Sequence, residues 1–237
     1  MLFKILNRMN IRSALILILS TILNLPVNSQ PLKIIKSPEE YRERILDDSL
    51  QQMVELNGFI PGIQYDLRYG SPRNFTGQRL YSQSKLTYLR ILPAQALMRV
   101  EEELRKKGMG LKIFDAYRPY SVTVKMWELI KDDRYVADPV KGSGHNRGLA
   151  VDLTIISLAS KKELEMGTGF DNFSDTAHQS FTNLPVKILK NRMLLRTLLE
   201  QNGFKALETE WWHYYWPNNR DYDVLDLDFK DLSLPAK

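Results

Sequence analysis

Apolar residues recur at every second position in one segment near the middle of the chain. In residues 149–155 (LAVDLTI), Leu149, Val151 and Leu153 face one way and Asp152 projects from the opposite face. This alternation predicts a strand with a carboxylate on one side. Further short apolar runs predict additional strands, at residues 63–67, 111–117, 204–207 and 210–216.

Three other segments repeat their apolar positions at the spacing of a helix. The first is predicted to begin at Pro93, which suits a first helical turn, and to stop at Gly108. The second covers residues 122–131, and the third covers residues 187–202 and ends at a glycine cap. Helices and strands therefore mix along the chain, and no internal repeat is present.

Two stretches without a clean period are predicted to be loops. Residues 160–183 are interpreted as a long functional loop, and an ordered loop rich in Gly, Pro and Asn is expected between the strand at 63–67 and Tyr81. Residues 30–40 are polar and contain two prolines. We expect them to form a short extended lead-in rather than a packed element.

The first 29 residues differ in character from the rest of the chain. Lys4, Arg8 and Arg12 precede an apolar run at residues 14–25, and small residues follow at 27–29. This order is typical of a secretory signal peptide, so we expect export to the periplasm or the medium. The apolar run is shorter than the roughly 20 residues that a membrane-spanning helix needs. An uncleaved membrane anchor is the alternative interpretation.

Composition narrows the function classes. The chain has 237 residues, and its formal net charge of +5 falls to +2 when the leader is removed. A mildly basic domain without a basic stripe interleaved with aromatic residues argues against a nucleic-acid partner. The sequence contains no cysteine. Disulfides, thiolate ligands and a lipid-modified cysteine are thus excluded, and any metal must be held by His, Asp or Glu.

Two short segments carry the residue types of a hydrolytic metal site. The segment SGHNRGLAVD supplies His145 and Asp152, and the segment ETEWWHYYW supplies His213 with Glu210 three positions before it. Two imidazoles and one carboxylate with an open position form the ligand set of a hydrolytic zinc, and Glu210 would accept the proton of an activated water. Gly148 would let the backbone bend so that His145 and Asp152 converge.

The spacing alone leaves other interpretations open. In an extended strand Glu210 and His213 point to opposite faces, so both reach one centre only if the backbone turns or bulges. Taken singly, His145 also fits a capping residue, Asp152 a turn acid, and His213 a member of an aromatic strand.

The two segments together resemble a known family of peptidases. SGHNRGLAVDLT and EWWHY resemble the SxHxxGxAxD and ExWH signatures of the D-alanyl-D-alanine dipeptidases, zinc enzymes of the D-Ala-D-Ala peptidase and hedgehog superfamily. DAYRP, MGTGFD and YDLRYGSPRNFTG match as well, so the similarity spans about residues 56–230. It implies a single α+β domain at 56–237, after a signal peptide at 1–29 and a lead-in at 30–55. The implied domain has a small antiparallel sheet with helices packed around it and the zinc site on the sheet.

The resemblance also implies the roles of the metal-site residues. His145, Asp152 and His213 would bind one Zn²⁺ per chain, and Glu210 would be the catalytic base that later passes its proton to the leaving amine. Arg118 would hold the developing oxyanion, which suits a permanently charged guanidinium fixed after a buried strand.

Substrate contacts follow from the same resemblance. Asp171 and Tyr69 would lie near the free amino end of the substrate, where a carboxylate pairs with the ammonium group. Ser143 would add a hydrogen bond to the substrate. Gly144 departs from the family pattern, because some members carry a second serine there. His178 matches no metal signature and is predicted to lie outside the metal site.

These features favour an exported zinc dipeptidase that hydrolyses D-alanyl-D-alanine during turnover or salvage of cell-wall dipeptides. The alternative is a D,D-carboxypeptidase or peptidoglycan endopeptidase of the same superfamily that acts on longer wall peptides. A third hypothesis is a non-catalytic wall-binding module. We expect a small dipeptide as the only partner, with no nucleic acid, no obligate protein partner and no stable membrane span after leader cleavage.

Overall fold

The computed structural model describes residues 31–82 and 85–233. The signal peptide predicted at residues 1–29 lies outside these described residues. From Leu32 onward the described chain forms one compact unit. Within that part of the chain, no helix has both the length and the apolar character needed to cross a membrane.

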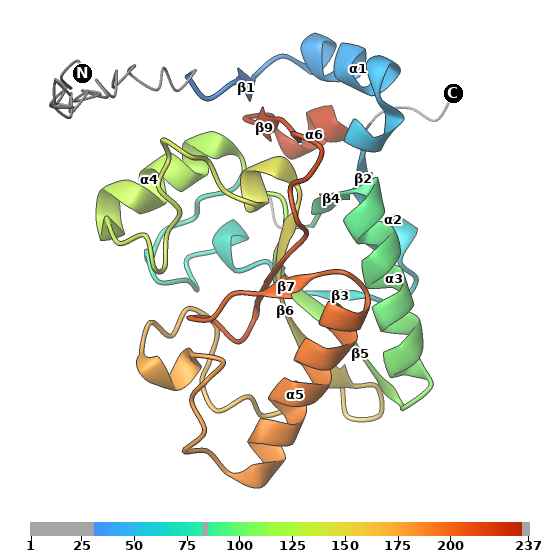
Figure 1. The fold of residues 1–237 in the computed structure, drawn as a ribbon, viewed down its shortest axis with the longest axis vertical. Coiled ribbons are helices and arrows are strands. Elements are labelled where there is room, and N and C mark those ends of the chain that lie inside the picture. Colours follow the sequence, from blue (N-terminus) through green and yellow to red (C-terminus); the bar gives the residue numbers. More distant parts are fainter. Residues whose placement is uncertain (1–30, 83–84, 234–237) are drawn as a thin grey trace, which may run out of the picture. The chain divides into compact units, whose positions relative to one another are not determined.

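A five-stranded sheet lies at the centre of this unit (Figure 1). Its strand order is β3-β5-β6-β8-β7, and the strands are β3 (Gln64–Tyr65), β5 (Met109–Asp115), β6 (Ala150–Ser157), β7 (Lys205–Ala206) and β8 (His213–Tyr215). Every neighbouring pair is antiparallel except β3 and β5, which run parallel. The expected small sheet in an α+β fold is therefore confirmed, with one parallel edge strand added.

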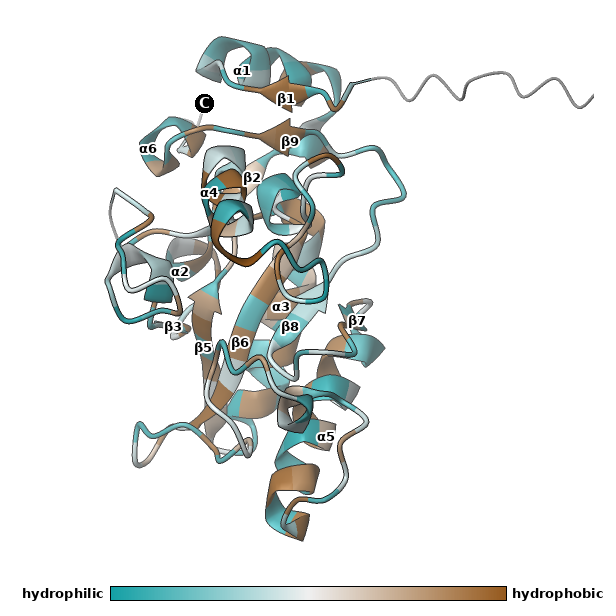
Figure 2. Ribbon diagram, turned by 90° about the vertical axis from the view of Figure 1, so that its left-hand side faces the viewer, coloured by the Kyte–Doolittle hydropathy of each residue, from teal (hydrophilic) through white to brown (hydrophobic). Residues whose placement is uncertain are grey.

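Two long helices, α3 (Ile91–Arg105) and α5 (Val186–Gln201), pack against this sheet and form the main core with it (Figure 2). The core combines apolar side chains of both helices with those of β5 and β6: Leu97, Val100, Leu104, Leu195, Leu198, Leu199, Leu111, Ile113, Val151, Leu153 and Ile155. The predicted alternation in β6 is confirmed, because its odd-numbered residues enter this core and leave Asp152 for the other face.

The predicted helices all form, with small shifts at their ends. The helix expected from Pro93 begins two residues earlier, the one expected at 122–131 is α4 (Tyr120–Ile130), and the third is α5. Shifts of this size are usual, because terminal turns are closed by local capping contacts. Residues 160–183 contain the short 3-10 turn η4 (Asp175–Ala177) and a single β-bridge from Glu163 to Ile156, and are otherwise a long loop as expected.

The prediction of an unpacked, extended lead-in at residues 30–40 is wrong from Ile34 onward. Strand β1 (Ile34–Ile35) pairs in parallel with β9 (Val224–Leu225), and helix α1 (Pro38–Asp47) follows it. Ser37 caps α1 by accepting hydrogen bonds from the first-turn N–H groups, and Pro38 occupies the first helical turn. Most residues of α1 are polar, but its Tyr41 is fully buried, as is Ile35 of the preceding strand β1. The segment therefore packs against the domain.

A second core joins the two ends of the domain. It contains Ile35 of β1, Tyr41 of α1, Val122 and Met126 of α4, Leu225 of β9 and Phe229 of α6 (Phe229–Leu232), together with Tyr117, which precedes α4. Strand β2 (Met53–Glu55) pairs antiparallel with β4 (Tyr88–Arg90), and the short helix α2 (Leu56–Phe59) follows β2. The 3-10 turns η1 (Ser49–Gln51), η2 (Arg68–Gly70) and η3 (His145–Arg147) complete the described fold.

A buried arginine links these segments to the loop that precedes β6. Arg90 is fully buried, and its guanidinium donates to the backbone oxygens of Gln51, Arg147 and Asp223. Its backbone N–H also donates to the oxygen of Gly148, at 2.9 Å. These carbonyl oxygens replace the water that would otherwise solvate the charged guanidinium. Through Arg90, the turn η3 is joined to strand β4 and to the segments that contain Gln51 and Asp223.

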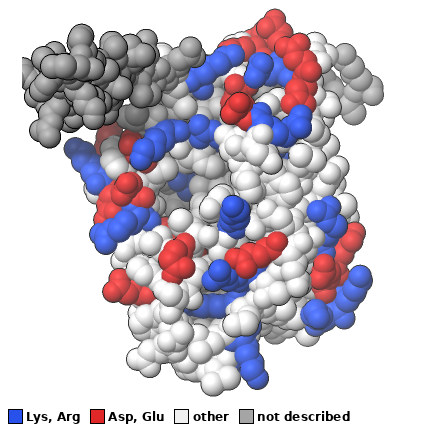
Figure 3. Space-filling view, viewed as in Figure 1, with Lys and Arg blue, Asp and Glu red and all other residues white. Residues whose placement is uncertain are grey.

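The face shown in Figure 3 carries charges of both signs, with Lys and Arg interspersed among Asp and Glu. That face therefore has the mixed surface expected of a mildly basic domain without a basic stripe.

Candidate metal centre

Three neighbouring strands place a row of polar side chains on the sheet face opposite the main core. Asp115 at the end of β5 pairs with Asp152 of β6, and Asp152 pairs in turn with His213 of β8. The register of β5 shifts between Ile113 and Asp115, which is a bulge of the kind that redirects a side chain. Cross-strand neighbours lie close together, so sheet pairing brings residues together that are far apart in sequence.

His145 approaches this row from the 3-10 turn η3, just before β6. Gly148 ends that turn with a φ of +68°, and a Cβ atom there would lie 2.4 Å from the sulfur of Met53. The expected bend at Gly148 is thus confirmed, and only glycine fits it. His145 Nδ1 lies 2.6 Å from the carbonyl oxygen of Ala116. Because a carbonyl only accepts, Nδ1 carries the proton and Nε2 presents its lone pair to the row.

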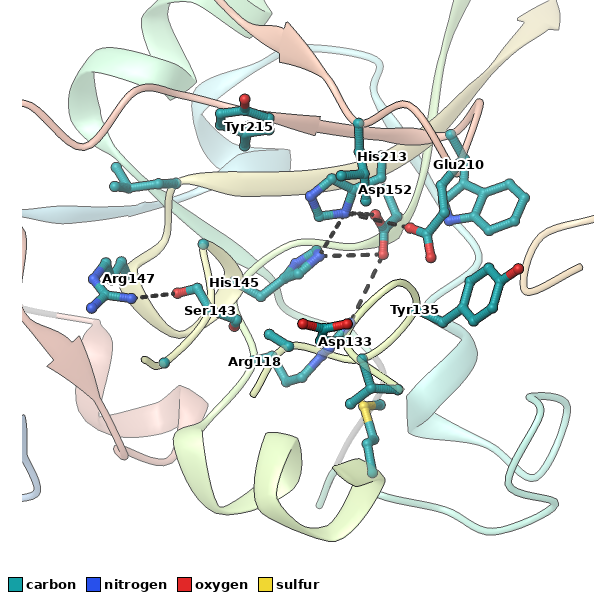
Figure 4. Close-up of a pocket in the computed structure, with 18 of the residues that line it drawn as sticks. Arg118, Asp133, Tyr135, Ser143, His145, Arg147, Asp152, Glu210, His213 and Tyr215 are labelled. Atoms are coloured by element: carbon teal, nitrogen blue, oxygen red, sulfur yellow. Dashed lines mark hydrogen bonds and ion pairs between the residues drawn. The ribbon is translucent and has the colours of Figure 1, made fainter. Parts of the chain in front are cut away.

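The predicted ligand atoms converge in the structure (Figure 4). Asp152 Oδ2 lies 3.4 Å from His145 Nε2, and Asp152 Oδ1 lies 2.8 Å from His213 Nδ1. The two imidazole nitrogens are 3.3 Å apart, and all three ligand groups lie within 4.8 Å of one another. Residues 61 and 68 positions apart are thus assembled into one cluster.

Glu210 lies beside the cluster because the chain turns before β8 begins. The N–H of His213 donates to the oxygen of Glu210 at 3.3 Å, which closes a turn over the intervening residues. Glu210 is therefore not part of the strand, and its Oε2 lies 3.8 Å from His213 Nδ1. The strand predicted at 210–216 is shorter than expected, and this shortening removes the objection that Glu210 and His213 would face opposite ways.

The protonation states of the cluster suit a cation. Burial opposes ionisation of Asp152, but attraction and hydrogen bonds from the two imidazoles hold its pKa well below its ordinary value. Burial lowers the pKa of His213 and so keeps its ring neutral. Burial and repulsion from Asp152 and Asp171 raise the pKa of Glu210. Asp152 is thus ionised and the ring of His213 neutral, which are the forms that bind Zn²⁺.

Arg118 is held next to the cluster by a carboxylate that the sequence analysis did not assign. Its Nε and Nη2 donate to Asp115 Oδ2 at 3.0 and 2.7 Å, and Nη2 lies 3.9 Å from Asp152 Oδ2. Asp115 is fully buried, and the hydroxyl of Tyr81 also donates to it at 2.5 Å. Asp115 begins the segment DAYRP, which matches the family, but neither this match nor its place at the end of an apolar strand indicated its contact with Arg118.

Asp171 occupies a constrained position on the long loop. Its φ is +60°, and its Oδ1 accepts a hydrogen bond of 2.9 Å from the hydroxyl of Tyr69. Its other oxygen, Oδ2, is enclosed and has no hydrogen-bond partner among the described residues. Burial raises the pKa of Asp171 from 3.8 to about 7, although the bond from Tyr69 acts in the opposite direction. The site thus holds one unsatisfied buried acceptor.

The remaining residues singled out in the sequence are Ser143 and Gly144, which precede η3, and His178 on the long loop. Ser143 is buried and accepts a hydrogen bond of 3.0 Å from the backbone of Asn146. At Gly144 a Cβ atom would lie 2.9 Å from the Cβ of Ala150, so this chain has little room for a serine there. His178 lies outside the cluster, and its contact is with the exposed Asp175 at 3.8 Å.

All the predicted site residues line one cavity of about 410 Å³: Tyr69, Arg118, Ser143, His145, Asp152, Asp171, Glu210 and His213. A cavity of this size is typical of small-ligand sites. Three converging ligand groups of the zinc type line this cavity, with a carboxylate and a guanidinium beside them. The fold and the site therefore define a metal-dependent hydrolase.

Comparison with known proteins makes the class specific. A sequence model of the M15 peptidases, described as D-Ala-D-Ala dipeptidase, matches residues 49–231, so the chain belongs to this family of metallopeptidases. It is 31% identical over 188 residues to the D-alanyl-D-alanine dipeptidase of Escherichia coli (strain K12), covering 78% of this chain and 95% of that protein. The corresponding enzyme of Enterococcus faecium is 29% identical over 183 residues, covering 67% and 88% of the two chains.

Similarity to solved structures is weaker. The LD-carboxypeptidase LdcB shares 20% identity and a TM-score of 0.40, covering 70% of this chain and 67% of that chain.

Proposed function

We propose that the protein is an exported zinc dipeptidase that hydrolyses D-alanyl-D-alanine, releasing two molecules of D-alanine from a dipeptide of cell-wall origin. The observation that carries this proposal is the presence in one cavity of the His145, Asp152 and His213 cluster, Glu210, and the unpartnered carboxylate oxygen of Asp171. The relatives that cover most of the chain are named for the same substrate.

The three cluster residues would hold the metal, one per chain, through His145 Nε2, an oxygen of Asp152 and His213 Nδ1. When bound, Zn²⁺ supplies Lewis acidity toward the peptide carbonyl and lowers the pKa of a water molecule to about 7. The hydrogen bond from His145 Nδ1 to Ala116 fixes the ring in the orientation that this role needs.

Glu210 moves the proton in the proposed reaction. It removes a proton from the attacking water onto its carboxylate, and water oxygen adds to the peptide carbonyl carbon. Glu210 then returns that proton to the nitrogen of the leaving D-alanine as the C–N bond breaks. Burial and the neighbouring carboxylates raise the pKa of Glu210 in the metal-free protein, and the positive charge of a bound metal would oppose this shift and favour the ionised carboxylate that the base needs.

Arg118 stabilises the negative charge that develops on the carbonyl oxygen. Its two bonds to Asp115 fix the guanidinium plane, and the ring of Tyr69 lies 5.1 Å from its central carbon. A donor that is fixed before the reaction needs no reorganisation when the charge appears. Asp115 therefore acts as a positioning residue for Arg118.

Asp171 and Tyr69 would bind the free amino group of the substrate. A substrate ammonium would satisfy the enclosed Oδ2 of Asp171, and the ion pair would favour the ionised carboxylate. Ser143, on another part of the cavity wall, would contribute a hydrogen bond to the substrate. This arrangement favours free dipeptides over peptides with a blocked amino end.

The proposal is tested with purified protein that lacks residues 1–29, loaded with zinc. Free D-alanine should appear from D-alanyl-D-alanine, and N-acetyl-D-alanyl-D-alanine should be a poor substrate. Glu210→Gln should lower kcat by about 10²- to 10⁴-fold and leave the zinc content unchanged. Undiminished turnover in this variant would refute the mechanism, and equal hydrolysis of the blocked peptide would favour a carboxypeptidase.

Export has its own test. The proposal depends on the basic and apolar leader in residues 1–29. Protein recovered from the periplasm or the medium should begin at Gln30 by N-terminal sequencing. Full-length protein retained in the membrane fraction would instead support the uncleaved anchor.

A further inference from the structure

Three loops that are remote in sequence meet beside the end of the cavity that contains Asp171. They are the segment 71–80, the segment 131–142 between α4 and η3, and the segment 167–174 that carries Asp171. None of them contains a helix or a strand. Their relative positions must therefore come from side-chain contacts rather than from a shared backbone ladder.

One aromatic side chain from each loop makes these contacts. The ring of Phe173 lies 5.2 Å from that of Phe75 at an angle of 66°, and 4.8 Å from that of Tyr135 in a stacked arrangement. Both distances are those of favourable aromatic pairs. We call Phe75, Phe173 and Tyr135 the aromatic bridge.

The aromatic bridge continues directly from the proposed binding point of the substrate amino group. The ring of Phe75 contacts that of Tyr69 edge-on at 6.1 Å, and the hydroxyl of Tyr69 donates to Asp171. Phe75 and Tyr135 line the cavity, whereas Phe173 contacts both rings without lining it. A peptide extended beyond the ammonium position would therefore meet the rings of Phe75 and Tyr135.

A hydrogen bond connects the loop that carries Tyr135 to the turn that contains Glu210. The hydroxyl of Thr209 donates to the backbone oxygen of Arg134 at 3.0 Å. Thr209 precedes Glu210, and Arg134 precedes Tyr135, so the loop that contributes Tyr135 is joined to the turn that positions the base. In Figure 4 Tyr135 and Glu210 lie on the same side of the metal cluster, and Ser143 and Arg147 lie on the other.

We propose that the aromatic bridge closes the amino side of the cavity and so limits the substrate to one residue before the scissile bond. This inference rests on the proposed dipeptidase function and identifies the groups that set its substrate length. Asp171 alone recognises an ammonium group, which a longer free peptide also has at its own end. A physical wall is what excludes the longer chain.

The test removes the ring that does not touch the substrate. Phe173→Ala should raise kcat/KM for D-alanyl-D-alanyl-D-alanine relative to D-alanyl-D-alanine by about 10-fold or more, because the wall loses its support. Phe173→Tyr keeps the ring and should retain the original ratio. Phe181→Ala is the matched control, since Phe181 is a partly buried phenylalanine later in the same long loop.

A second readout needs no turnover. Hydrogen exchange of the backbone in residues 131–142 should increase in Phe173→Ala and remain unchanged in Phe181→Ala, because Phe173 contacts that loop through Tyr135. If wild-type protein fails to hydrolyse D-alanyl-D-alanine, the proposed function falls, while the exchange result still shows whether the rings hold the loops together.

Three results would overturn the inference. The first is wild-type hydrolysis of the tripeptide at the rate of the dipeptide. The second is an unchanged substrate ratio in Phe173→Ala with both activities lowered together, as expected of a general structural role. The third is unaltered exchange in residues 131–142.

Discussion

Asp171→Asn should make the metal-free protein more stable at alkaline pH while it weakens substrate binding. Asn is the appropriate replacement because φ at this position is +60°, a region that Asn adopts readily and most other residues do not. Asn also keeps the acceptor for the hydroxyl of Tyr69. The substitution therefore removes the charge and changes little else.

The magnitude follows from the pKa of Asp171. Burial raises this pKa from 3.8 to about 7 in the folded protein, so between those values the folded state holds a proton that the unfolded state has lost. Stability therefore falls as pH rises through this range. The loss at Asp171 amounts to about 2 kcal/mol at pH 5 and about 4 kcal/mol at pH 8. Asn does not titrate, so the variant avoids this loss.

The assay is urea unfolding of both proteins in the presence of a chelator, at pH 5 and at pH 8. The difference in free energy of unfolding, variant minus wild type, should be about 2–3 kcal/mol larger at pH 8. The new amide N–H in an enclosed position costs about 1–3 kcal/mol at both pH values and cancels from this comparison. Asp221→Asn is the control, because Asp221 is exposed and also has a positive φ.

The same variant should lose affinity for the dipeptide. Removal of a hydrogen-bonded charge pair should raise KM for D-alanyl-D-alanine by about 10- to 100-fold at pH 8. A variant that is less stable than wild type by the same amount at both pH values would show that the carboxyl group is not perturbed, and would refute the reasoning.

Three further predictions concern the support of the metal centre. Arg118→Lys should lower kcat by about 10²- to 10³-fold with a small change in KM, because lysine cannot make the paired contact with Asp115. Steady-state kinetics measures both constants, and an unchanged kcat would contradict the prediction. Zinc at about 1,000 times its Kd should raise the free energy of unfolding by about 4 kcal/mol, and a His213→Ala variant should lose most of this gain. Gly148→Ala should destabilise the protein by at least about 1–3 kcal/mol in urea unfolding, since it combines a strained φ with a clash against Met53.

Much of the fold could be predicted because its elements have local signals. The alternation in β6 and the capped period of α5 reflect side chains that face one core, and both appear where the sequence placed them. Helix α1 is not among the predicted helices, although Ser37 as N-cap, Pro38 in the first turn and two first-turn glutamates are favourable signals for a helix N-terminus. The prolines and the polar residues of this segment favour an extended conformation in the sequence, whereas Tyr41 belongs to a core that also contains Leu225 and Phe229 from the far end of the domain.

The candidate site divides in the same way. The motifs identify the cluster residues, but the spacing of Glu210 and His213 is compatible with one centre only because a turn precedes β8. No local pattern predicts that turn. Asp115 and Phe173 were not assigned because their importance arises from cross-strand pairing and from contacts between loops, which a single sequence does not encode locally.

The pairing of β1 with β9 has a consequence for how this domain is made. Ile34 and Ile35 pair with Val224 and Leu225, and Ile35 also accepts a hydrogen bond from the backbone of Asp226, so their partners lie at the other end of the described domain. During folding, the apolar residues at the start of the domain therefore lack this strand partner until residues 224–225 are available, so the contact requires closure of a very long loop. A nonsense mutation shortly before residue 224 would retain every metal ligand and still yield a protein prone to aggregate through its beginning.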